Sequence, residues 1–195
     1  MRFLFGLALL MTAVSAQAAP HPATGSSPLT DPSKGVFFHG FGFRLKSIGP
    51  HWAPTPVLSE SVFESLRFES LRKDGSKDAS ISLHLERMAK ASPLEAYARK
   101  WMKEYSSYGF EVLGTKSVLL NGEKALLVDL TQNKKNRQIR QAILQNEDRV
   151  VVVTCIDRKD LFQRTLGVCN DFLRGFEWVS EKTPTLIESK TPQSR

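Results

Sequence analysis

Apolar side chains recur at helical spacing between residues 92 and 108, where they form one stripe bordered by charged residues. Pro93 suits the first helical position, and Ser92 and Glu95 have the spacing of an N-terminal capping box. Gly109 is a natural end for the segment. We therefore predict an amphipathic helix whose stripe packs in the core. The stripe consists of Leu94, Tyr97, Ala98, Trp101, Met102 and Tyr105.

A second apolar stripe at the same spacing follows Asp157 and is expected to end at Gly175. Its aromatic content resembles a ligand-binding surface, but core packing is the interpretation that this periodicity favours. The stripe consists of Leu161, Phe162, Thr165, Leu166, Cys169, Phe172 and Leu173.

Between and before these segments the hydrophobic period becomes two. Apolar and polar residues alternate over residues 80–86, with His84 among the polar ones, so we expect a strand with one face in water. Asp74-Gly75 marks a turn before this strand, after the stretch 63–72. Residues 41–45 are predicted to form the opening strand of the sheet.

Two hairpins follow the first helix. Asn121-Gly122 predicts a tight turn between strands at 116–120 and 124–130. Residues 137–145 and 149–156 form the other predicted pair, and its run of four valines favours a central position beneath the helices. Strands joined by tight turns are antiparallel. The expected fold class is α+β, an antiparallel sheet of about six strands packed by two main α-helices.

The ends of the chain have a different character. Residues 1–18 combine a basic start, an apolar run and an Ala-Gln-Ala cleavage site, the pattern of a bacterial secretory signal peptide. Residues 19–35 and 180–195 lack apolar periodicity and contain several prolines, so we expect a flexible tether and a disordered tail. One folded domain is then expected at 36–179. The protein is predicted to be periplasmic or secreted, without a transmembrane anchor.

The export prediction bears on the redox state of the two cysteines, Cys155 and Cys169. An even number of cysteines in an exported chain favours a disulfide between them. They fall at the end of a predicted strand and on the inner stripe of the following helix, offset axially by about 5–10 Å in ideal geometry. The alternative is a pair of buried free thiols.

The formal charge of +7 is spread over the chain and includes one cluster of basic residues before and within a strand. Export argues against nucleic acid as the partner, which leaves an envelope protein, an anionic envelope polymer or lipid headgroups as candidates. A solvated basic face is the simpler interpretation. The cluster consists of Lys134, Lys135, Arg137 and Arg140.

No motif for catalysis, cofactor binding or metal binding is recognisable. The four histidines are scattered, and phosphate loops, nucleophile elbows and zinc-ligand spacings do not occur. We therefore predict no catalytic, cofactor or metal residues. The rival hypothesis is an enzyme assembled from distant residues such as Tyr97, His51, Arg44 and a carboxylate.

The order of elements resembles the PsbP-like superfamily, which includes periplasmic DcrB-type and mycobacterial LpqN-type proteins. The resemblance covers residues 36–179 and is carried by Gly40-Phe41-Gly42-Phe43-Arg44-Leu45 leading to Trp52, the helix 92–108, the meander around Asn121-Gly122, the segments 150–155 and 161–173, and Phe176-Glu177-Trp178.

This resemblance implies an accessory, assembly or binding protein without enzymatic activity, and it offers no catalytic constellation to transfer. The sequence thus predicts an exported, non-enzymatic binding or accessory protein with no cofactor. Two alternatives stay open, an envelope enzyme and a purely structural accessory of an envelope complex.

Overall fold

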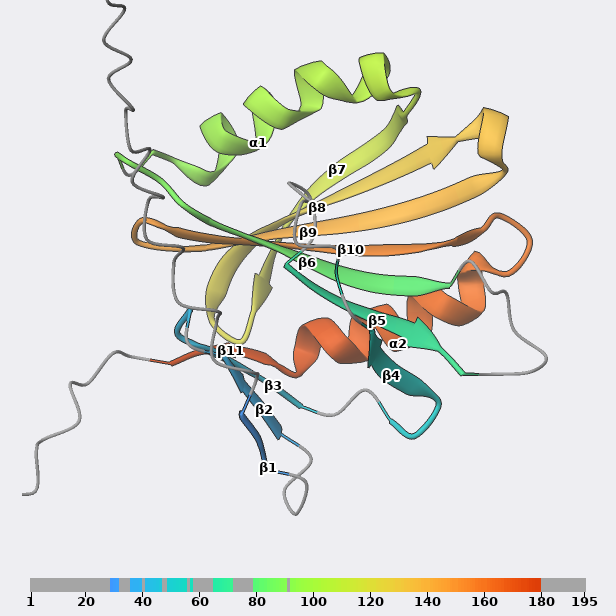
Figure 1. Ribbon diagram of the computed structural model, residues 1–195. Coiled ribbons are helices and arrows are strands. Elements are labelled where there is room, and N and C mark those ends of the chain that lie inside the picture. Colours follow the sequence, from blue (N-terminus) through green and yellow to red (C-terminus); the bar gives the residue numbers. More distant parts are fainter. Residues whose placement is uncertain are drawn as a thin grey trace, which may run out of the picture.

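A computed structural model gives the architecture of the chain (Figure 1). The predicted signal peptide, the predicted tail and the Asp74-Gly75 turn lie outside the described residues, as does the predicted tether except for Leu29–Asp31. The limits predicted for the domain therefore stay a prediction. The structure describes residues 29–31, 36–39, 41–46, 49–55, 57, 65–71, 79–90 and 92–179.

Seven antiparallel strands form the larger sheet, in the order β4-β5-β6-β10-β9-β8-β7. Asn121 and Gly122 have φ values of 51° and 88°, and two positive values are what a tight type I′ hairpin turn requires. The valine-rich strand β10 lies in the middle of the sheet, as predicted. The strands are β4 (Trp52–Thr55), β5 (Leu66–Ser70), β6 (Ser80–Arg87), β7 (Glu111–Leu120), β8 (Glu123–Gln132), β9 (Arg137–Asn146) and β10 (Arg149–Arg158).

A second sheet has the order β1-β2-β3-β11. The prediction of one sheet of about six strands is therefore wrong in number, because the described residues form eleven strands in two sheets. The predicted opening strand at 41–45 corresponds to β3, which pairs with β11 in this second sheet. No local pattern reveals a pairing between such distant segments. These strands are β1 (Leu29–Asp31), which falls within the predicted tether, β2 (Val36–His39), β3 (Phe43–Lys46) and β11 (Phe176–Trp178).

The two predicted helices are present, one on each face of the larger sheet (Figure 1). The first is α1 (Leu94–Glu104), continued by the 3₁₀ turn η1 (Tyr105–Tyr108), and the second is α2 (Phe162–Arg174). Side chains of β10 alternate between them: Val150 and Val152 pack with α1, and Val151 and Val153 pack with α2. Burial of both faces explains the continuous valine run, and each buried valine contributes about 1.5–3 kcal/mol.

Because helices cover both faces of the larger sheet, the expectation that β6 has one face in water is wrong. Ser82 is buried, and His84 is half-buried with its ring against Trp101 of α1. The predicted capping box is also wrong: α1 begins after Pro93 without a side-chain cap, and the Ser92 hydroxyl donates to the Met88 sulfur instead. Tertiary packing rather than capping therefore stabilises this helix.

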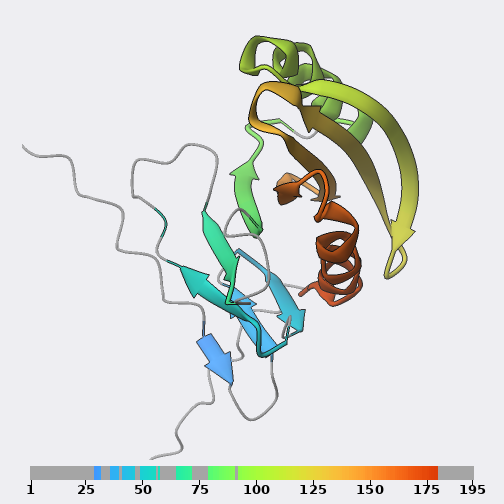
Figure 2. The same ribbon diagram turned by 90° about the vertical axis from the view of Figure 1, so that its right-hand side faces the viewer.

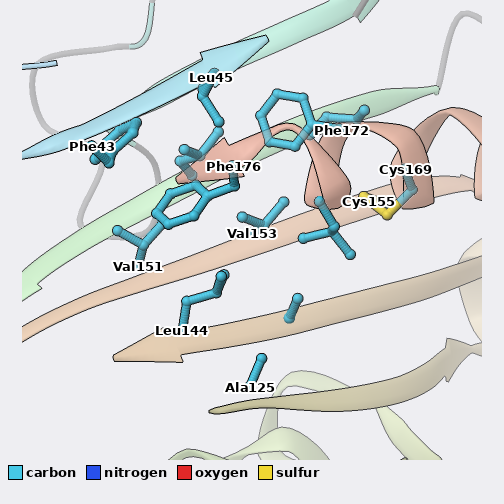
Figure 3. Close-up of a cluster of buried hydrophobic side chains, with 14 of the residues drawn as sticks. Phe43, Leu45, Ala125, Leu144, Val151, Val153, Cys155, Cys169, Phe172 and Phe176 are labelled. Atoms are coloured by element: carbon cyan, nitrogen blue, oxygen red, sulfur yellow. A yellow bond between two sulfur atoms is a disulfide. The ribbon is translucent and has the colours of Figure 1, made fainter. Parts of the chain in front are cut away.

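A core cluster beneath α2 joins the two sheets (Figure 3). Phe43 of β3 stacks on Phe176 of β11, with ring centroids 5.1 Å apart, and Phe172 of α2 packs edge-on against Phe68 of β5. The larger sheet curves around α2, and the β7–β8 hairpin curls round beside it (Figure 2). Asn121 at the tip of that hairpin donates to the carbonyl oxygen of Phe176 at 2.6 Å. Among the described residues, no helix is long and apolar enough to cross a membrane.

Candidate functional site

Several polar side chains interrupt the apolar face of the sheet that α1 covers, among them Thr154, Gln141 and His84. Thr154 of β10 lies opposite Gln141 of β9, and His84 of β6 lies opposite Val152 of β10. Alternation along each strand directs these positions to the α1 side, where Ile143 belongs to the same core cluster as Val152. Polar groups in a helix-covered layer need hydrogen-bond partners, so their contacts decide what the site can do.

The polar groups form a short chain of hydrogen bonds. The Tyr105 hydroxyl donates to Oε1 of Gln141, and Nε2 of Gln141 donates to Oγ1 of Thr154 at 3.2 Å. The orientation of the Gln141 amide is thereby set from two sides. Tyr105 comes from η1, so the helical segment and two strands each contribute one side chain to this series of hydrogen bonds.

A second contact lies at the edge of α1. The Tyr97 hydroxyl donates to Oε2 of Glu86 at 2.7 Å, and the same carboxylate oxygen lies 3.7 Å from Nε2 of His84. The His84 ring meets Trp101 edge-on, with centroids 5.8 Å apart. The imidazole is therefore held between a carboxylate on its own strand and an indole on the helix.

These side chains leave a recess of about 100 Å³ between α1 and the sheet. A volume of this size holds about three water molecules or one compact organic group, at about 30 Å³ per water. It is smaller than the roughly 300–1,000 Å³ of a typical small-molecule pocket. The recess therefore suits one end group of a larger molecule. Its lining consists of His84, Trp101, Tyr105, Gln141, Ile143, Val152 and Thr154.

The tyrosines at this site are poor acids. Burial, reinforced by the hydrogen bond to Glu86, holds the pKa of Tyr97 well above its usual value. Burial raises the pKa of Tyr105 to about 12. Both hydroxyls stay protonated at neutral pH, and each uses its single proton in the hydrogen bond to Glu86 or to Gln141. A polar group in the recess would therefore be held by the remaining hydrogen-bonding capacity of Tyr105, Gln141 and Thr154, which line it.

A second hollow, of about 450 Å³, lies between the second sheet and the β9–β10 turn. Arg149 is buried beside it, donates to the Phe41 carbonyl oxygen at 3.2 Å and to Asn146 Oδ1 at 2.7 Å, and has its guanidinium over the Trp178 ring. Arg87 contacts Asp148 at 3.4 Å. Because Arg149 links the β9–β10 turn to the Phe41 carbonyl and to Trp178 of the second sheet, we interpret this hollow as a structural junction.

The predicted basic cluster is divided by the structure. Lys134 and Lys135 are exposed on the 3₁₀ turn η2 (Asn133–Lys135), and Arg137 follows at the start of β9. Arg140 lies on the α2 side of the sheet, where Asp129 accepts two hydrogen bonds of 2.8 Å from its guanidinium. This pairing raises the pKa of Arg140 further. Arg140 thus belongs to the packing beneath α2 and does not extend the exposed cluster.

The predicted disulfide is confirmed. Cys155 and Cys169 are bonded, with Cα atoms 6.1 Å apart, and neither is accessible to solvent. The Cα separation lies within the range that a disulfide requires, so the axial offset expected from ideal geometry does not prevent the bond. Because the chain contains two cysteines, the bond leaves no free thiol as a nucleophile or metal ligand.

The residues proposed for a dispersed catalytic site do not meet. Arg44 is on the second sheet, where its Nε donates to Glu177 at 2.6 Å, and His51 is exposed on the turn before β4. Tyr97 is a buried residue of α1 and donates to Glu86. In the described part of the chain, no group of three or more histidine, cysteine, aspartate or glutamate side chains could hold a metal ion.

Sequence reasoning did not find the recess. The available signal was a polar residue, Thr154, directly after four valines in a strand predicted to be central. Its significance depends on Gln141 and His84, which come from other strands and are brought beside it by strand register.

No protein-family model matches the chain, and no curated protein matches it in sequence. Solved structures are similar in fold. The cyanobacterial PsbP (CyanoP) from Synechocystis sp. PCC 6803 aligns with a TM-score of 0.54 and 12% identity, covering 71% of this chain and 87% of that one. The chain has the PsbP-like fold.

Two further structures share this PsbP-like fold. LpqN, described as involved in cell envelope biogenesis of Mycobacterium tuberculosis, aligns with a TM-score of 0.50 and 15% identity, covering 67% of this chain and 80% of that one. A protein of unknown function from Pseudomonas aeruginosa, described as a putative regulator, has a TM-score of 0.51 and 12% identity, with coverages of 64% and 95%. The predicted superfamily resemblance is confirmed at the level of the fold.

Proposed function

We propose that the protein is an extracytoplasmic accessory protein without enzymatic activity, which binds an uncharged polar group of a larger envelope molecule in the recess beneath α1. The observation that carries this proposal is the chain of neutral donors and acceptors from Tyr105 through Gln141 to Thr154 beside an unfilled volume. A layer with only a packing role is normally filled by apolar side chains, without voids.

One prediction and two observations support an extracytoplasmic location. The chain begins with a predicted secretory signal, and a buried disulfide is typical of proteins in oxidising compartments. The fold is also that of LpqN, which is described as an envelope-biogenesis protein.

The character of the recess supports binding over catalysis. Tyr105, the tyrosine that lines it, is held protonated, and the Thr154 hydroxyl oxygen accepts a hydrogen bond from an amide. An enzyme would instead need a group whose pKa is tuned towards the working pH.

Titration with compact neutral probes tests this proposal. Acetamide, glycerol and N-acetylglucosamine carry amide or hydroxyl groups, and two-dimensional ¹H–¹⁵N NMR of the protein would follow the indole of Trp101 and the side-chain amide of Gln141. We expect saturable shifts at these two groups for at least one probe. Val152→Leu places a larger side chain at the recess and should abolish these shifts.

Thr154→Val removes the hydroxyl without changing the side chain's size and should weaken the shifts, whereas Thr115→Val makes the same change on exposed β7 and should not. An absence of shifts for all three probes, or shifts that persist in Val152→Leu, would refute the recess as the binding site. Chemical conversion of a probe would refute the non-enzymatic assignment instead.

A further inference from the structure

Exposed apolar residues gather at one end of the molecule, where η1 leads into β7. Tyr108, Val112 and Leu113 are 50%, 41% and 54% exposed. They lie within six consecutive positions, although exposed large apolar side chains are few among the described residues. Apolar side chains scattered singly over a surface need no explanation, but a group of them at one place indicates an interaction site.

A β-bulge contributes to this exposure. In the pairing of β7 with β8, Val112 lies opposite Leu130 and Gly114 lies opposite Asp129, so Leu113 is the extra residue. A bulge near a sheet edge redirects the side chain it carries, and here it leaves a leucine facing solvent. β7 is also one of the two edge strands of the larger sheet.

Segments that carry lysines are held next to these apolar residues by hydrogen bonds. Gln132 donates to the carbonyl oxygen of Tyr108 at 3.2 Å, which joins the end of β8 to η1. Asn133 of η2 donates to Glu111 of β7 at 3.1 Å and accepts from the Lys159 ammonium. The η2 turn, with Lys134 and Lys135, is therefore fixed next to the apolar residues.

The charge of this end is predominantly positive. Glu111 accepts the hydrogen bond from Asn133, and Asp160 is paired with Arg158, so these two acidic groups have polar partners of their own. Exposed Glu104, at the end of α1, is a third acidic group near this end. Hydrogen bonding to Arg158 lowers the pKa of Asp160, which keeps it ionised. The basic residues here are Lys134, Lys135, Arg137, Arg158 and Lys159.

We propose that this end of the molecule is a peripheral attachment surface for an anionic lipid bilayer, formed by Tyr108, Val112, Leu113, Lys134, Lys135 and Lys159. Lysines beside exposed aromatic and aliphatic side chains fit such a bilayer, because the ammonium groups meet anionic headgroups while the apolar groups enter the interfacial region. A soluble polyanion would use the lysines alone. The attachment surface has no residue in common with the recess. The proposal of membrane attachment is therefore tested independently of the proposed function.

Vesicle co-sedimentation tests the proposal, using protein purified after expression of the full-length chain, with its N-terminus read by mass spectrometry. We expect binding to vesicles of phosphatidylglycerol and phosphatidylcholine in equal parts, little binding to pure phosphatidylcholine, and weaker binding as salt rises from 50 to 200 mM. Neutralising two lysines in Lys134→Gln/Lys135→Gln should lower the partition coefficient about 30-fold at low salt, at about 1 kcal/mol per charge.

Matched variants locate the effect. Lys90→Gln/Lys124→Gln removes the same charge at the opposite end of the strands and should change binding less than twofold. Leu113→Ser should weaken binding about fivefold, whereas Leu119→Ser, at a residue 70% exposed near the far end of β7, should not. All four variants change exposed side chains, and thermal unfolding would verify that each is folded.

Several results would overturn the proposal. They are no binding to either vesicle, equal binding to both, or an equal loss in the two lysine variants. Binding to soluble polyphosphate that matches vesicle binding and is unchanged by Leu113→Ser would assign the surface to an anionic polymer instead.

Discussion

Removal of the disulfide should destabilise the protein mainly through its unfolded state. Cys155 and Cys169 are 14 positions apart, and a cross-link that closes a loop of about 15 residues removes about 3 kcal/mol of chain entropy from the unfolded ensemble. Both side chains are fully buried, so replacement by alanine also leaves small voids, at about 1 kcal/mol each. We expect Cys155→Ala/Cys169→Ala to lower the free energy of unfolding by about 3–5 kcal/mol.

Urea titration followed by tryptophan fluorescence measures this loss. For a domain of about 150 residues, 3 kcal/mol corresponds to a fall in Tm of roughly 6–12 °C. The m value should rise in the variant, because an unfolded chain without the cross-link exposes more surface. Wild-type protein titrated with and without reductant is the control, since it changes no side-chain volume and isolates the entropic part of about 3 kcal/mol.

A loss below about 1 kcal/mol in both comparisons would refute the reasoning, as it lies outside the range typical of native disulfides. An unchanged m value together with a full loss of stability would place the effect in the folded state instead. The buried position of both sulfurs adds a kinetic expectation, namely that reductant acts on the folded protein no faster than the protein opens.

Two further predictions concern backbone strain and high pH. Gly42→Ala should destabilise the protein by about 2–4 kcal/mol in urea titration, because Gly42 has a φ of 86° and a Cβ there would lie 1.9 Å from Nη1 of buried Arg149. Gly109→Ala, with a φ of 77° and open space around it, should cost only about 1–2 kcal/mol, and equal losses in the two variants would contradict a role for Arg149. Burial raises the pKa of Tyr105 to about 12 in the folded protein, from a value near 10 in the unfolded chain. The contribution of Tyr105 to the free energy of unfolding is therefore fully present below about pH 10 and is lost as the pH rises to about 12. The urea midpoint of wild type should therefore fall more steeply over this interval than that of Tyr105→Phe, and parallel curves would disprove the assignment.

Local elements of the fold were predictable where one stretch of chain makes its own contacts. The stripe of α1 and the Asn121-Gly122 turn depend on neighbours within a few residues, and both are found where the pattern indicates. The second sheet was missed because β3 pairs with β11, with Phe43 opposite Trp178, and almost the whole domain separates these two strands in the sequence. No periodicity within a single segment carries information about such a partner.

The candidate site was less predictable than the fold. Gln141 and Thr154 are unremarkable polar residues in the sequence, and they become a hydrogen-bonded pair only because the register of β9 and β10 sets them opposite each other. His84 was expected on a face in water, but α1 returns over that face and places Trp101 against it.

The sequence by itself indicated the two helices, the hairpin meander and the central valine strand, and it favoured the pairing of the cysteines, which the structure then confirmed. These depend on backbone hydrogen bonding, on near-neighbour spacing and on there being one other cysteine to pair with. Only the tertiary structure decided that the helices cover opposite faces, that a recess stays open beneath α1, and that exposed apolar residues at 108–113 lie beside the lysines of η2. Burial and exposure are properties of what packs from elsewhere in the chain, so the local pattern leaves them open.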